Sequence, residues 1–155
     1  MNTFEHLEHE ACKDGIEVID YHFQSSKIKG LYCNNTVALS KELETNADKS
    51  SVLAEELGHH YTTVGDIIDL ESVENRKQEF RARLWAYNKL IGLQGILSAY
   101  KANFHTLNEI SEHLEVSEEF LAEALECYRK KYGVCTKIDN YVIYFEPHLG
   151  VMELI

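Results

Sequence analysis

The 155 residues, 45% of them hydrophobic, are enough for one domain with a substantial core, and no apolar run approaches the length of a membrane span. The 26 acidic residues outnumber the 15 basic ones and give a formal charge of −11, which argues against a general nucleic-acid binder because phosphate contacts need clustered lysine and arginine. The four cysteines form no C-x-x-C pair, so we expect no structural zinc site and mostly buried, reduced thiols.

The first forty residues predict one helix and three strands. Apolar residues at helical spacing predict a helix over 3–14, and β-branched and aromatic residues predict a strand over Ile16–Tyr21. The segments Gly30–Cys33 and Thr36–Ser40 flank Asn34-Asn35, which is a favourable two-residue turn. A β-hairpin is therefore expected at this place.

The middle of the chain predicts long helices. One follows the capping residues of 45–48 and contains Ser51–Asp66, with its end near the last of these residues. A second long helical segment covers about Ser72–Ala102, with weak interruptions at Gly92 and Gly95.

Two more helices and a second hairpin are expected in the last third of the chain. The helices cover Thr106–Leu114, which opens on the capping-box pattern T-x-x-E, and Ser117–Tyr132. The hairpin pairs Val134–Ile138 with Tyr141–Phe145 around Asp139-Asn140. Together the elements predict an α+β fold, mainly helical, with a small N-terminal sheet or hairpin and a C-terminal β-hairpin.

The sequence pattern of the two helices of residues 106–132 is typical of a helix-turn-helix pair. The second helix would present four glutamates to DNA phosphates, namely Glu118, Glu119, Glu123 and Glu126. Its basic residues, 129–131, all lie at the far end. We therefore expect this pair to pack or to dock a partner, without direct contact to nucleic acid.

The helix within Ser51–Asp66 sorts its side chains onto two sides. At about 100° per residue, Glu55, Glu56 and His59 fall within about 100° of one another, close to a quarter-turn. The opposite side is a core-facing stripe that consists of Leu53, Leu57, His60 and Val64. A carboxylate and imidazole group facing away from the core is what a metal site on a helix requires.

This polar group resembles the H-E-x-x-H motif, in which two histidines one turn apart hold zinc and the intervening glutamate polarises water. Alignment of Glu55–His59 with that motif makes Glu56 the base and His59 the second ligand. A shift by one residue would pair Glu56 with His60 but would make Leu57 the base, which is chemically impossible.

A third protein ligand is needed for a catalytic site that leaves one position for water. The second long helix offers Glu71, Glu74 and Glu79, and the first two lie where the helix dipole favours carboxylates in any case. Glu79 is preferred because the small residues on its face, Ala82 and Ala86, would let the two helices approach closely.

The two segments LAEELGHHYTTVGD and QEFRARLWAYNKLI together resemble the ImmA/IrrE family of metallo-endopeptidases, which occur in phages and mobile elements. The family pattern is L-A-H-E-x-x-H, a short gap, and E-x-x-A-x-x-[FW]-A. The resemblance covers about residues 15–130 and implies that Glu56 is catalytic and that His59 and Glu79 bind zinc. The hairpin with GLYCNN is also similar, and the helix around the third ligand is matched by Ala82, Trp85 and Ala86.

One position departs from the family pattern, because Glu55 stands where the family has its first histidine. Glutamate can bind zinc through oxygen, and its place one turn before His59 suits a ligand. A site with two carboxylates and one imidazole should acidify bound water less than a two-histidine site does. Zn²⁺ is the expected ion, and a harder ion such as Mn²⁺ is the second candidate.

The resemblance implies a zincin-like single domain over 1–155, with a catalytic core at 1–103 and the helical pair and hairpin at 104–155. It also implies a metal-dependent endopeptidase that cleaves or inactivates a helix-turn-helix repressor of a phage or mobile element. The acidity of the chain suits docking on such a basic protein. The alternative is a catalytically degenerate relative that acts by binding the repressor.

The N-terminus has neither the basic start nor the apolar core of a signal peptide. A cytoplasmic location without a membrane partner is therefore expected.

Overall fold

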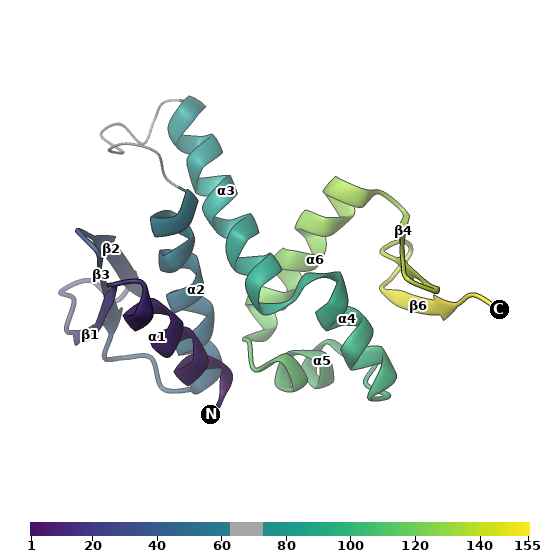
Figure 1. Ribbon diagram of the computed structural model, residues 1–155, viewed down its shortest axis with the longest axis horizontal. Coiled ribbons are helices and arrows are strands. Elements are labelled where there is room, and N and C mark those ends of the chain that lie inside the picture. The colour runs from purple at the N-terminus through teal and green to yellow at the C-terminus, as the bar shows by residue number, and fades with distance from the viewer. Residues whose placement is uncertain (63–72) are drawn as a thin grey trace. The chain divides into compact units, whose positions relative to one another are not determined.

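The computed structural model describes the backbone of residues 1–62 and 73–155 and the side chains of 1–62 and 76–155. These residues contain six helices and six short strands (Figure 1), which confirms the prediction of a mainly helical α+β fold. None of the described helices is long and apolar enough to cross a membrane. The chain divides into two compact units, Met1–Ala86 and Tyr87–Ile155. The single domain with a division after residue 103 remains a prediction.

The first unit combines a three-stranded sheet with helices. In chain order its elements are α1 (Thr3–Lys13), β1 (Glu17–Tyr21), β2 (Gly30–Cys33), β3 (Thr36–Ser40), α2 (Asn46–Thr62) and most of α3 (Val73–Leu90). The strand order is β1-β3-β2, with β1 parallel and β2 antiparallel to β3. Asn34 and Asn35 both have positive φ, of 48° and 59°, as the tight turn of the predicted hairpin requires.

The core of this unit lies between α1, α2 and β3 (Figure 1). It is formed by the buried residues Leu7, Ala11, Val37, Leu39, Leu53, Ala54 and Leu57. The predicted stripe of α2 is thus confirmed at both leucines. His60 is only half-buried, because its ring lies at the margin of this core and bonds to Tyr32. The end predicted for this helix near Asp66 lies outside the described residues.

Helices α2 and α3 approach each other most closely at Gly58. A Cβ atom placed on Gly58 would overlap the carbonyl oxygen of Ala82 and lie 2.9 Å from its carbonyl carbon. Ala82 and Ala86 are both buried, as the prediction of a close helix approach requires. Only a residue without a side chain fits at position 58.

The second unit contains the end of α3 followed by helices and a second sheet. Its further elements are α4 (Gly92–Lys101), α5 (Leu107–Leu114), α6 (Glu118–Tyr132), β4 (Cys135–Ile138), β5 (Tyr141–Tyr144) and β6 (Gly150–Glu153). The capping box of Thr106 and Glu109 is confirmed. The antiparallel order β4-β5-β6 extends the predicted hairpin by a third strand, β6, which the sequence pattern did not predict.

The long segment predicted over 72–102 is divided into α3 and α4, and a buried tyrosine stabilises the division. The hydroxyl of Tyr128 in α6 donates to Oδ1 of Asn88 at 3.0 Å and accepts from the N–H of Gly92 at 3.2 Å. Gly92 has a φ of 61°, which ends the regular helix. Burial also raises the pKa of the Tyr128 hydroxyl, which therefore stays protonated.

The cysteines differ from the prediction of mostly buried thiols. Cys12, Cys33 and Cys135 are exposed, and Cys127 is half-buried. Two of the exposed thiols lie on the edge strands β2 and β4, where alternate side chains face solvent.

Gly58→Ala should lower the free energy of unfolding by about 2–3 kcal/mol, because the new methyl group overlaps backbone and the helices must move apart. Chemical denaturation monitored by circular dichroism measures this loss. Gly95→Ala in α4 is the matched control, since the atom nearest to its Cβ would be the flexible end of Leu114 at 3.3 Å, and Ile91 would lie in ordinary contact at 3.8 Å. The control should be neutral or stabilised by up to about 1 kcal/mol through helix propensity. Equal stability of the two variants would contradict the close contact between α2 and α3 at Gly58.

Tyr128→Phe should lower the free energy of unfolding by about 1–2 kcal/mol, because Asn88 and the N–H of Gly92 both lose a hydrogen-bond partner. Thermal or urea denaturation measures the change. The control is Tyr132→Phe, which keeps the stacking of that ring on Phe145 at 6.2 Å between centroids. A Tyr128→Phe variant as stable as this control would show that the hydroxyl does not hold the helix break.

Candidate active site

Two of the predicted site residues meet across α2 and α3. Nε2 of His59 lies 3.5 Å from Oε1 of Glu79, and the two side chains are 19% and 36% exposed. One nitrogen and one carboxylate oxygen are thus presented close together at a place that solvent can reach.

The helix crossing accounts for this meeting. Gly58, which contacts Ala82, directly precedes His59 in α2. Glu79 lies three residues before Ala82 and therefore on a neighbouring position of the same side of α3. The contact between the two small residues brings the imidazole and the carboxylate to the same end of the crossing.

Glu56 lies in a strongly acidic environment. Its pKa is raised to about 7, first by burial and then by the negative charges of Glu55 and Glu79. A hydrogen bond that its carboxylate accepts from the backbone N–H of Tyr32 acts in the opposite direction. A carboxyl group of this kind can both accept and release a proton near neutral pH.

Tyr32 of β2 is a site residue that sequence reasoning missed. Besides the backbone bond to Glu56, its hydroxyl lies 2.6 Å from Nδ1 of His60. Gly30 shows why the strand can come so near, because a Cβ atom there would lie 2.6 Å from Val52 and 3.2 Å from Cγ of Glu56. The glycine at the start of the strand was the only signal of this approach in the sequence.

A row of aromatic rings borders the cluster. The centroid distances are 5.4 Å from Tyr32 to His60, 4.8 Å from His60 to Tyr61, and 5.0 Å from Tyr61 to Trp85. The hydroxyl of Tyr61 donates to Asp14 at the end of α1, and burial together with this bond raises the pKa of Tyr61 to about 12. The row ties the last turn of α2 to β2, α3 and the end of α1.

Two side chains, His59 and Glu79, have donor atoms that suit a divalent ion. An imidazole nitrogen and a carboxylate oxygen, as offered by His59 and Glu79, are common ligands of zinc and manganese. Over residues 1–62 and 76–155, no group of three His, Cys, Asp or Glu side chains is arranged to hold a metal ion. Glu55 acts on Glu56 through its charge but does not complete a three-donor group. Of the alternative ligands, Glu71 and the side chain of Glu74 lie outside the described part.

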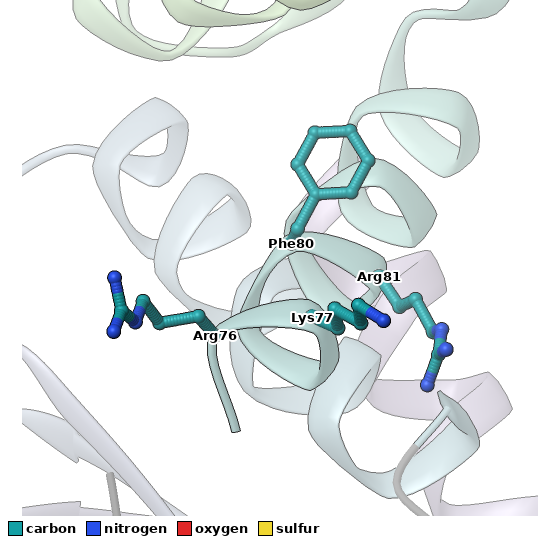
Figure 2. Close-up of a pocket in the computed structure, with 4 residues that line it drawn as sticks. All are labelled: Arg76, Lys77, Phe80 and Arg81. Atoms are coloured by element: carbon teal, nitrogen blue, oxygen red, sulfur yellow. The ribbon is translucent and has the colours of Figure 1, made fainter. Parts of the chain in front are cut away.

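A hollow in the surface of α3 is separate from this cluster. Figure 2 shows it lined by Phe80, with Arg76 to one side and Lys77 and Arg81 to the other. Phe80 is two residues from Ala82, which places it about 200° around the helix from the crossing. Three cationic side chains at this hollow make it unsuitable for a metal cation.

Comparison with protein families matches residues 11–126 to the IrrE N-terminal-like domain of peptidase M78. Comparisons with curated proteins and with solved structures give no match. The matched range begins near the end of α1, ends within α6, and includes Glu55, Glu56, His59 and Glu79.

Proposed function

The chain belongs to the peptidase M78 family of IrrE N-terminal-like domains, and from this premise we propose that it is a metal-dependent endopeptidase that acts on a protein. The resemblance to the ImmA/IrrE peptidases noted in the sequence is the same assignment. The observation that carries the proposal is the meeting of His59 with Glu79 beside the half-buried carboxyl group of Glu56.

In this proposal His59 and Glu79 would hold the ion, and Glu55, one helical turn before His59, would be the third ligand. Zn²⁺ is the proposed ion, with Mn²⁺ as the second candidate because oxygen ligands dominate. Bound at these residues, the ion would supply Lewis acidity toward a peptide carbonyl.

Glu56 is the proposed proton carrier of the reaction. Its carboxylate takes a proton from the attacking water and later delivers that proton to the amine of the departing peptide. The surrounding burial and negative charge support this role, because they raise the proton affinity of the group into the neutral range. The N–H of Tyr32 orients one carboxylate oxygen, which leaves the other for the water.

The proposed substrate is a helix-turn-helix repressor of a phage or mobile element, met in the cytoplasm. The formal charge of −11 supports docking on a basic DNA-binding protein. The hollow around Phe80 is locally basic, so a basic repressor would dock on another part of the surface.

The second candidate function is binding of the repressor without cleavage. Glu55 at the first ligand position favours it, and so does the arrangement of only two donors among the described side chains.

Glu56→Gln should lower kcat/KM for repressor cleavage by about 10²–10⁴-fold, because the variant cannot carry the proton. Incubation with a repressor encoded near the gene, followed by mass spectrometry of the products, measures cleavage. The matched control is Glu119→Gln on the exposed side of α6, which should cleave like the wild type. If the wild type and Glu56→Gln both inactivate the repressor without any cut product, the binding function is correct and the peptidase proposal is wrong.

Glu55→His should tighten zinc binding by about tenfold, because an imidazole is a better zinc ligand than a single carboxylate oxygen at this position. Competition with a chromophoric chelator measures the affinity, and circular dichroism verifies the fold. His59→Ala and Glu79→Gln should each weaken binding by at least about tenfold, since each removes one donor. A folded Glu55→His protein that no longer binds zinc would refute the ligand assignment.

A further inference from the structure

We propose that Tyr32 is a positioning residue for Glu56. The bond between its hydroxyl and His60 holds strand β2 on α2, so that the peptide N–H of Tyr32 stays on the Glu56 carboxylate. The catalytic consequence of this arrangement rests on the proposed peptidase function, whereas the arrangement itself can be tested without it.

Strand β2 lies along a single row of α2 side chains. Val52, Glu56 and His60 follow one another at intervals of four residues and therefore form one ridge of the helix, so Glu56 and His60 are neighbours and do not lie on opposite sides as the sequence predicted. The site that Gly30 occupies is bounded by Val52 and Glu56, and Tyr32 bonds to Glu56 and His60. Gly30 and Tyr32, which are successive positions on one face of the strand, thus lie beside successive pairs of residues on the ridge. This match fixes how the strand is aligned along the helix.

The hairpin leaves the N–H of Tyr32 available for Glu56. Cys33 and Thr36 flank the two-residue turn and are the pair that exchanges hydrogen bonds, so the next pair, which contains Tyr32, makes none. The bond from the N–H of Ser40 to the carbonyl of Lys29 fits the same alternation. Because β2 is an edge strand, this N–H points away from β3 at the open edge of the sheet. The Glu56 carboxylate accepts a hydrogen bond from it.

The phenol of Tyr32 is held from two sides. Its oxygen lies 2.6 Å from Nδ1 of His60 and 3.2 Å from Oδ1 of Asn35 in the hairpin turn. Both bonds form at once when His60 donates from Nδ1 and the hydroxyl donates to Asn35. The two rings also meet edge to face, with an interplanar angle of 73°. The hydroxyl therefore connects the turn, the strand and the last turn of α2.

Loss of this connection should affect the turnover step and leave substrate binding unchanged. A glutamate side chain has several rotatable bonds, and the N–H of Tyr32 restricts one end of it. If β2 moves away from the ridge, Glu56 keeps its chemical nature but adopts the reactive orientation less often.

Amide hydrogen exchange measured by NMR tests the arrangement directly. Tyr32→Phe and His60→Phe each remove one end of the bond, keep an aromatic ring and should speed exchange of the residue-32 amide by about tenfold. Tyr61→Phe is the matched control, because it removes a hydroxyl that bonds to Asp14 instead. The amides of Leu31 and Cys33 bond to β3 by the alternation above, so their unchanged exchange in every variant shows that the hairpin is intact.

Kinetics on the metal-loaded enzyme test the consequence. Tyr32→Phe and His60→Phe should lower kcat by about fivefold to tenfold with KM within about twofold, and the double variant should be no slower than either single one. The bound metal per chain should match the wild type. Wild-type kcat in Tyr32→Phe, or a residue-32 amide that exchanges equally fast with and without the hydroxyl, overturns the proposal. If the wild type cleaves nothing, the peptidase function fails, and the amide exchange still decides whether Tyr32 holds Glu56.

Discussion

The candidate site depends on the contact between Gly58 and Ala82. His59 and Glu79 lie 3.5 Å apart because the backbones of α2 and α3 touch nearby. Gly58 is one residue from His59, and Ala82 is three residues from Glu79. Metal sites tolerate ligand displacements of only about 0.2 Å, whereas a methyl group between the helices would separate them by far more. The glycine in E-E-L-G-H is therefore a geometric requirement of the candidate site, although it contributes no ligand of its own.

Much of the first unit, and the contact between His59 and Glu79, was predictable because local signals agreed with the packing. Asn34-Asn35 predicted the hairpin, since asparagine tolerates the positive φ that a tight turn needs. The helical spacing of small residues predicted that Glu79 would reach the first helix, and the structure places it beside His59. These predictions succeeded because each depended on neighbours within one or two helical turns.

The remaining features depend on contacts that local patterns do not encode. The bond to Glu56 uses the backbone N–H of Tyr32, which every residue except proline offers, so no side-chain pattern could reveal it. The break between α3 and α4 is held by Tyr128, which lies thirty-six residues after Gly92 in the chain. The acidic character of the site was visible in the sequence, but the structure was needed to show that His59 and Glu79 meet without a third donor among the described side chains.

The aromatic row beside the cluster has a practical consequence. Trp85 is the only tryptophan of the chain, and it stacks on Tyr61 with 23° between the ring planes. Excitation at the red edge of the indole band therefore selects one fluorophore, which lies in α3 and stacks on Tyr61 of α2. Its emission and its quenching report on the separation of the two helices without any label. The protein thus carries an intrinsic fluorescent probe of the packing between α2 and α3.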